Sequence, residues 1–249
     1  MSMLGPYASW NKETGYAVWD HPTAEYTGIF ERINVGIKGI IHVGMWDFVE
    51  YGCYTKLVGN KVVGVEANPD VYKTMAKPVA DQWGFKCFNE FTSDKDGEVR
   101  NFYFAGEGSS LYQGQPAWNK HTSIKVQTKT LATVLDENNI DPAEYDFLNI
   151  DAEGSELDIL KGYERYLSHV NVIDLETSYD DRHLSGASHD KIASWLSERG
   201  FELKEQSPTY DSQQWGDSVF VRVDRELPPF VDGNAGNAIY GEKYLENSR

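Results

Sequence analysis

The sequence has few cysteines and no long apolar run. Cysteine occurs twice in 249 residues, at Cys53 and Cys87, and this spacing matches neither a disulfide framework nor a zinc site. We therefore expect two buried free thiols. No stretch approaches the roughly 20 consecutive apolar residues of a membrane helix, and the first residues lack the basic start and apolar run of a secretory signal. These absences predict a cytoplasmic protein without a membrane partner.

Basic residues are scarce relative to acidic ones. The chain has 23 Lys and Arg against 39 Asp and Glu, which gives a formal net charge of −16. Nucleic-acid-binding proteins gain most of their non-specific affinity from Lys and Arg. The charge therefore argues against a nucleic-acid partner and favours a small molecule or a neutral glycan.

Short β-rich runs alternate with helical patterns along most of the chain. The expected strands are Gly39–Val43, Lys61–Glu66, Phe85–Asn89, Val99–Ala105, Ile124–Thr128, Phe147–Ile150, Asn171–Glu176 and Val219–Val223. The expected helices are Pro69–Asp81, Leu131–Asn138, Ser155–Leu167 and Ser188–Arg199. Several strands are almost continuously apolar, as is typical when helices cover both sheet faces. The pattern predicts an α/β fold with a doubly wound, mainly parallel sheet and ligands at the carboxyl ends of its strands.

We expect a main domain over residues 39–225 with an extension at each end. Residues 1–38 carry scattered aromatics and one short amphipathic pattern, which predicts an N-terminal extension that packs on the main domain. Residues 226–249 contain prolines and glycines and predict an irregular C-terminal tail. Within the main domain, Gly106–Ser123 is long and rich in Gly and Ser, so it is either a substrate loop or a surface insertion.

Two strand ends carry features of a nucleotide site. Gly44 follows the first strand, where the lack of a side chain lets the backbone approach a ligand closely. The second strand ends in Glu66, followed by Ala67, Asn68 and Pro69. An acid about 20 residues past a glycine turn is where nucleotide-binding folds bind ribose hydroxyls. The alternative interpretation of Glu66 is a solvated loop carboxylate.

Three carboxylates cluster at a later strand end. The segment DFLNIDAEGSELDILKG ends its strand in Asp151 and places Glu153 and Glu156 before a helix. Asp151 and Glu153 lie where a substrate hydroxyl would bind, whereas Glu156 is either functional or a first-turn acid stabilised by the helix dipole. A few carboxylates hold Mg²⁺ only weakly without help from a substrate. We therefore expect no essential metal.

These segments together resemble the FkbM family of methyltransferases, from about Gly39 to Val223. The matched segments are HVG at 42–44, EANP at 66–69, FTSDKDG at 91–97, Ser109–Leu111, NIDAEGSE at 149–156, and Glu176 at a late strand end. The resemblance is specific because many elements agree in order and spacing. It implies a Rossmann-like methyltransferase fold.

The resemblance also implies a cofactor and a reaction. The cofactor is S-adenosylmethionine, and its methyl group is transferred to a hydroxyl, commonly on a sugar or a polyketide-like natural product. By carry-over, Gly44 borders the methionine part, Glu66 binds the ribose, Asp94 lies near the adenine and Asp151 near the reacting methyl. The cofactor-binding residues predicted on this basis are His42, Gly44, Glu66, Asn68, Ser93, Asp94 and Asp151.

The expected chemistry requires a base. A sugar hydroxyl is a poor nucleophile until its proton leaves, so a general base within hydrogen-bond reach is expected. Asp151 is the first candidate, and Glu153 and Glu176 are the next. Alignment of the acceptor oxygen with the methyl group supplies the rest of the catalysis.

The first loop departs from the family pattern and leaves an alternative open. The family usually continues G-A-x-x-G, whereas this sequence continues from Gly44 through Met45, Trp46 and Asp47 to Phe48. If the bulky rings block the cofactor, the chain is a catalytically inactive module that binds a glycan or a protein. An NAD-dependent oxidoreductase is disfavoured because G-x-G-x-x-G is missing, and a glycosyltransferase because no D-x-D follows a strand.

Overall fold

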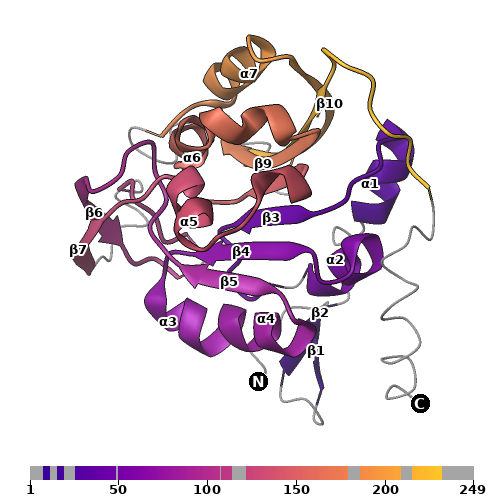
Figure 1. The fold of residues 1–249 in the computed structure, drawn as a ribbon. Helices are drawn as coiled ribbons and strands as arrows, with labels where there is room; N and C mark the ends of the chain where they lie inside the picture. The colour runs from indigo at the N-terminus through magenta and orange to yellow at the C-terminus, as the bar shows by residue number, and fades with distance from the viewer. Residues whose placement is uncertain are drawn as a thin grey trace.

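A seven-stranded sheet forms the centre of the molecule (Figure 1). The computed structural model describes residues 8–11, 16–19, 26–48, 50–106, 108–113, 122–178, 186–208 and 215–231. The strands of the sheet are β3 (Ile40–Val43), β4 (Val62–Glu66), β5 (Lys86–Asn89), β8 (Phe147–Ile150), β9 (Val172–Ser178), β10 (Phe201–Pro208) and β11 (Trp215–Arg222). Their order is β10-β11-β9-β8-β3-β4-β5.

The sheet is mainly parallel and doubly wound, as the sequence predicts. Pairs β3–β4, β4–β5, β3–β8 and β8–β9 are parallel, and β11 runs antiparallel to both β9 and β10. The chain moves outward from β3 to β4 and β5, then returns to β8 on the other side of β3. The strand order therefore reverses between β3 and β8, and ligands bind at the carboxyl ends of the strands at such a reversal.

Helices cover both faces of this sheet (Figure 1). One face packs against α1 (Tyr26–Ile33), α2 (Tyr51–Val58), α3 (Pro69–Val71) and α4 (Lys77–Trp83). The other packs against α5 (Leu131–Glu137), α6 (Glu156–Gly162) and α7 (His189–Ser197). Alternate residues of β3 follow this division, because Ile40 belongs to the first apolar cluster and Ile41 to the second. Burial on both faces explains why the central strands are almost continuously apolar.

Two further pairs of strands lie outside the main sheet. β6 (Val99–Tyr103) and β7 (Ser123–Gln127) form an antiparallel pair, as do β1 (Ala8–Asn11) and β2 (Tyr16–Trp19). The β6–β7 pair carries a small apolar cluster of its own, built on Phe102, Leu111 and Val126. Figure 1 shows this pair projecting beyond the end of the sheet at which β3 and β4 finish.

Some expected elements differ from the observed ones. Neither α2 nor β10 was predicted, and the helix expected over Pro69–Asp81 contains a π-helical stretch, Tyr72–Ala76. The helix expected from Ser155 ends at Gly162 and continues as a 3₁₀ stretch, Glu164–His169; a second 3₁₀ stretch is Pro142–Glu144. Both cysteines are free, but Cys53 is only half-buried, which corrects the expectation that both are buried.

Residues before and after the main domain contact it. Phe30 of α1 packs edge-on against Phe147 of β8, with ring centroids 5.1 Å apart. The backbone N–H of Gly36 donates to the carbonyl oxygen of Pro228 at 2.8 Å, and Phe230 packs on the same apolar cluster as α1. Among the described residues, every helix is too short or too polar to cross a membrane.

Candidate active site

The loops after β3 and β8 touch each other where the strand order reverses. Gly44 has a φ of 86°, and a Cβ added there would lie 1.6 Å from the carbonyl oxygen of Asp151. The N–H of Asp151 donates to the carbonyl oxygen of Val43 at 2.9 Å. Only glycine fits this close approach, because a side chain would be both strained and overlapping. The close contact with Gly44 thus fixes the position of Asp151 at the carboxyl end of the sheet.

Glu66 is a buried carboxylate at the end of β4. Its side chain is 6% exposed, and it accepts hydrogen bonds from the N–H groups of Trp46 at 2.9 Å and Asn68 at 2.7 Å. Burial raises the pKa of Glu66, and these backbone donors act in the opposite direction. Its geometry corrects the alternative of a solvated loop carboxylate. The side-chain oxygen of Asn68 caps α3 by accepting from the N–H of Asp70 at 3.1 Å.

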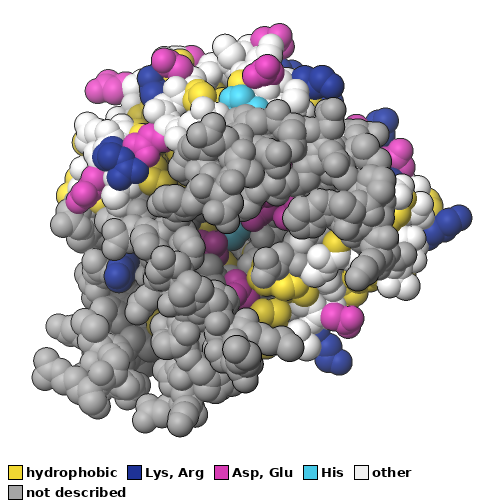
Figure 2. All heavy atoms as spheres, turned by 180° about the vertical axis from the view of Figure 1, so that it is seen from behind, with side chains coloured by type: hydrophobic (Ala, Val, Ile, Leu, Met, Phe, Trp, Pro, Cys, Tyr) yellow, Lys and Arg dark blue, Asp and Glu magenta, His cyan; other side chains and the backbone are white. Residues whose placement is uncertain are grey.

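Asp151, Glu153 and Glu176 form a group of carboxylates, with one oxygen from each lying within 4.8 Å of the others. Asp151 is accessible to solvent, and the other two are half-buried. Crowding by protein atoms raises the pKa of Asp151 well above its ordinary range, and nearby carboxylates, first that of Glu176, raise it further. Figure 2 shows acidic side chains near the middle of one face of the molecule. The structure therefore brings the three predicted catalytic acids together.

The loop that carries Glu153 is held from within by Glu156. Glu153 has a φ of 53° and Gly154 a φ of 99°, so the chain turns sharply here. The buried carboxylate of Glu156 accepts hydrogen bonds from the N–H groups of Ala152 at 3.1 Å and Gly154 at 2.9 Å. These contacts favour a structural role for Glu156 over a catalytic one.

A buried row of polar side chains lies beneath the carboxylate group. His42, Asn149 and Asp174 are register partners across β3, β8 and β9. The hydroxyl of Tyr54 lies 3.3 Å from His42 Nδ1 and accepts from Asn149 Nδ2 at 2.8 Å. Burial lowers the pKa of His42 to about 3, so its ring is neutral at pH 7. Phe48 and Tyr54 pack on the ring of His42. Contact between His42 and the cofactor stays a prediction.

Glu50, at the start of α2, was not predicted as a site residue. Its Oε2 is buried and lies 4.0 Å from His42 Nδ1. Burial raises the pKa of Glu50 to about 7, and the charges of Asp47 and Asp217 add to this effect. Asp217 is the register partner of Glu176 on the neighbouring strand. The site thus has more carboxylates than the sequence indicated, and at least two of them hold a proton more tightly than usual.

The bulky residues of the first loop have separate positions. Phe48 is fully buried with a φ of 56°, and its ring packs against Phe85 at 5.5 Å and Tyr54 at 5.9 Å between centroids. It belongs to the apolar core and does not fill the crevice. Trp46 is half-buried, and its N–H donates to Glu66. The buried position of Phe48 therefore removes one of the two reasons for expecting an inactive module; the other reason, Trp46, remains.

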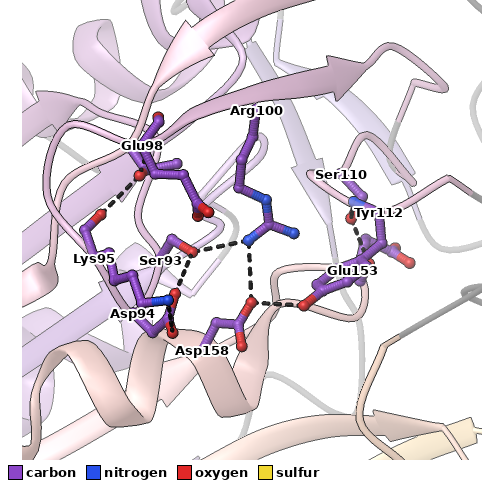
Figure 3. Close-up of polar contacts among 10 residues, drawn as sticks. Ser93, Asp94, Lys95, Glu98, Arg100, Ser110, Tyr112, Glu153 and Asp158 are labelled. Carbon is purple, nitrogen blue, oxygen red and sulfur yellow. Dashed lines mark hydrogen bonds and ion pairs between the residues drawn. The ribbon is translucent and has the colours of Figure 1, made fainter.

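Ser93 and Asp94 follow β5 and lie near the β6–β7 pair (Figure 3). Ser93 is fully buried, and its hydroxyl accepts from a guanidinium N–H of Arg100 at 2.9 Å. Asp94 is half-buried, and its carboxylate accepts from the Ser93 hydroxyl at 3.4 Å. Contacts of Ser93 and Asp94 with the cofactor stay predictions. Because Ser93 is fully buried, it would affect cofactor binding through the residues that surround it.

Comparison with known proteins identifies the family. The family model described as the methyltransferase FkbM domain matches residues 35–203. No curated protein sequence matches. A putative tRNA methyltransferase from Streptococcus pneumoniae is similar at 11% identity and a TM-score of 0.44, over 82% of this chain and 72% of that chain. The magnesium protoporphyrin IX methyltransferase of Synechocystis PCC 6803, solved with bound cofactor, has 12% identity and a TM-score of 0.41, over 81% and 78%.

The family model covers more than half of the chain. The matched residues include β3, β4, β8 and β9 and the carboxylates at the ends of β4, β8 and β9. The chain therefore belongs to the FkbM methyltransferase family and is an S-adenosylmethionine-dependent methyltransferase.

Proposed function

We propose that the chain transfers the methyl group of S-adenosylmethionine to a hydroxyl of a small molecule, namely a sugar or glycan. The observation that carries this proposal is the group of Asp151, Glu153 and Glu176 beside the glycine turn at Gly44. A hydroxyl bound there meets several acceptor oxygens and a carboxylate that takes up protons readily.

The residues at the crevice fit the cofactor. When bound, S-adenosylmethionine supplies a methyl group already activated as a sulfonium. One oxygen of Glu66 accepts the backbone N–H of Trp46 and the other that of Asn68, and a carboxylate has about four acceptor positions, so Glu66 can also accept from a ribose hydroxyl. The negative carboxylate group complements the positive sulfonium. We assign Glu66 to the ribose and Gly44 to the methionine part.

Asp151 is the proposed general base. A base works best when its pKa lies close to the working pH, and an ordinary Asp is too weak a base for an alcohol. Crowding and the neighbouring charges of Glu176 and Glu153 raise the pKa of Asp151 and so strengthen it as a base. Glu153 and Glu176 also offer oxygens that orient the hydroxyl. Asp151 would take up the proton of the acceptor hydroxyl while the acceptor oxygen bonds to the methyl carbon and the sulfur–methyl bond breaks, leaving the demethylated thioether form of the cofactor.

The charge of the site favours a neutral acceptor. With a net charge of −16, and with Asp217 near the carboxylate group, the site repels phosphates. We therefore propose a sugar hydroxyl and no nucleic-acid substrate. Two free cysteines suit a reducing compartment, and we place the reaction in the cytoplasm.

The test is methyl transfer from radiolabelled S-adenosylmethionine to a panel of sugars and oligosaccharides, with tRNA as a further acceptor. Asp151→Asn keeps the size of the side chain and removes the base, and we expect turnover to fall about 100- to 10,000-fold. Asp190→Asn, an exposed change in the first turn of α7, serves as the matched control and leaves turnover unchanged. Near-normal turnover of a folded Asp151→Asn variant, or labelling of tRNA alone, would overturn the proposal.

A further inference from the structure

Three consecutive residues after β6, Ser109–Leu111, make three different contacts. Ser109 closes a turn, because its hydroxyl donates to the carbonyl oxygen of Gly106 at 2.6 Å and accepts from the N–H of Ala105 at 3.0 Å. Leu111 is buried with Phe102 in the apolar cluster of the β6–β7 pair. Neither contact reaches the carboxylate group. Ser110, between them, contacts the backbone carbonyl group of Glu153, whose side chain belongs to that group.

Ser110 connects the β6–β7 pair to the loop after β8. It exchanges backbone hydrogen bonds with Tyr103, at 2.8 and 3.1 Å, which extends the pairing of β6. Its hydroxyl donates to the carbonyl oxygen of Glu153 at 2.6 Å and accepts from the N–H of Tyr112 at 2.9 Å. The side chain is 2% exposed, so water does not compete for these bonds. The hydroxyl therefore reaches Glu153 from a firmly held backbone.

Glu153 needs such support. Its φ of 53° lies in the left-handed region, which is unfavourable for a residue with a side chain. Glu156 holds the N–H groups on either side of Glu153 from within the loop. Ser110 holds the carbonyl group of Glu153 itself. The two contacts together keep a conformation that the isolated chain would avoid.

We propose that Ser110 is a positioning residue of the methyl-transfer site: it holds Glu153 in the left-handed conformation in which its carboxylate meets those of Asp151 and Glu176. The inference rests on the proposed function of this carboxylate group. It also gives a role to the Ser109–Leu111 segment, which the proposed reaction does not otherwise use.

A second set of contacts keeps Ser110 in place (Figure 3). Asp158, in the first turn of α6, accepts from the hydroxyl of Tyr112 at 2.6 Å and from Arg100 at 3.1 Å. The guanidinium of Arg100 also lies over the ring of Tyr112, 4.7 Å from its centroid. Because α6 directly follows the loop that contains Glu153, these contacts hold residues on both sides of the Ser110 bond together.

The pKa of Asp151 distinguishes a positioning role of Ser110 from a purely structural one. The charge of Glu153 is one of the causes that raise the pKa of Asp151. If Glu153 moves away when its carbonyl group is released, the pKa of Asp151 falls. A serine that only stabilises the fold would lower the melting temperature and leave this pKa unchanged.

The experiment follows the carboxyl carbons of ¹³C-labelled aspartates by NMR as a function of pH, with Asp151 assigned from the Asp151→Asn spectrum. We expect a lower pKa for Asp151 in Ser110→Ala and an unchanged one in Ser109→Ala, which removes a neighbouring hydroxyl with two hydrogen bonds of its own. Ser110→Thr, which keeps the hydroxyl, restores the wild-type value. If Ser110→Ala does not fold, Ser110→Cys makes the same test, because a thiol has a similar shape and is a weak donor.

Turnover gives the second readout. We expect kcat to fall about tenfold in Ser110→Ala while the KM for S-adenosylmethionine stays unchanged, and no further loss when Ser110→Ala is added to Glu153→Gln. An unchanged pKa of Asp151, or equal effects of the two serine variants, would overturn the inference. The titration needs neither cofactor nor acceptor, so it remains interpretable even if Asp151→Asn shows that the proposed base is wrong.

Discussion

The carboxylates at the ends of β4 and β8 are close in the fold and differ in what surrounds them. Burial raises the pKa of Glu66, and its backbone donors, the N–H groups of Trp46 and Asn68, oppose this effect by stabilising the charged form. Crowding by protein atoms also raises the pKa of Asp151, but here the neighbouring groups are carboxylates, which destabilise its charged form further. Glu66 is therefore better suited to accept hydrogen bonds in its charged form. Asp151 is suited to take up a proton.

On the proposed function, this difference divides the strand ends into a binding side and a reacting side. The binding side, at β4, is built from backbone groups whose positions are fixed by the strand and its loop. The reacting side, at β8 and β9, is built from side chains that repel one another, so it needs external supports such as Ser110 and Glu156. Changes on the two sides should consequently affect different measurements.

The largest effect is expected where the two sides touch, at Gly44. Gly44→Ala places a methyl group on the carbonyl oxygen of Asp151 and strains a φ of 86°. We expect a loss of about 3 kcal/mol or more in the free energy of unfolding, because the backbone must shift in addition to the strain. Urea denaturation measures this loss, which should be accompanied by loss of cofactor binding.

Gly97→Ala is the matched control for Gly44→Ala. Its φ of 72° is also left-handed, but a Cβ there meets nothing within 4 Å. We expect only about 1 kcal/mol of strain and normal cofactor binding. Equal losses in the two variants would show that the contact with Asp151 does not matter.

The next effect concerns the binding side. Glu66→Gln keeps the shape of the side chain but replaces one acceptor oxygen by a donor that faces a backbone N–H. Loss of a charged acceptor costs about 1.5–3 kcal/mol, so cofactor affinity should fall about 10- to 100-fold. Calorimetric titration with S-adenosylmethionine measures it. Turnover at saturating cofactor should change little, in contrast to Asp151→Asn.

The reacting side should show itself in the pH dependence. Because the pKa of Asp151 is raised, kcat should be lost on acidification at a higher pH than an ordinary Asp would give. Glu176→Gln removes the largest neighbouring charge and should move this loss to lower pH. If the pH at which kcat is lost is the same in Glu176→Gln, then the loss of kcat at low pH does not come from protonation of Asp151.

The same group predicts the sign of a stability effect. Between the ordinary and the raised pKa of Asp151 the folded state holds more protons than the unfolded chain, so stability falls as the pH rises through this window. Asp151→Asn should flatten that part of the curve of melting temperature against pH. An unchanged slope would mean that other carboxylates dominate it.

The sequence predicted the strand ends of this site and missed what lies beneath them. β3, β4 and β8 are apolar runs that stop at Gly44, Glu66 and Asp151, so pattern alone locates their ends. The contact of Tyr54 with His42 depends on α2, whose sequence YGCYTKLV has no clear helical pattern and is stabilised by packing. The sequence signal that could have indicated this buried polar row was the single polar residue within otherwise apolar strands.

The register of the paired strands and the backbone conformation of the first loop could not be predicted from the sequence either. His42, Asn149 and Asp174 line up only because β3, β8 and β9 pair in this register, and each lies in a separate segment of the chain. Phe48 appears from its position to face the ligand, but its left-handed φ turns the ring into the core. β10 was missed because an exposed strand with several charged residues resembles a loop.

The smallest effect is expected from metal removal. Oxygens of Asp151, Glu153 and Glu176 lie within 4.8 Å of one another, a spacing that a divalent cation can bridge. The raised pKa of Asp151 means that these carboxylates share a site in which full ionisation is unfavourable without a cation. If protons, and not a cation, offset the repulsion among these carboxylates, and Asp151 acts as the base once it is ionised, dialysis against EDTA leaves kcat unchanged. Loss of turnover on dialysis, restored by Mg²⁺ and accompanied by a fall in the pKa of Asp151, would instead make the reacting side a metal site.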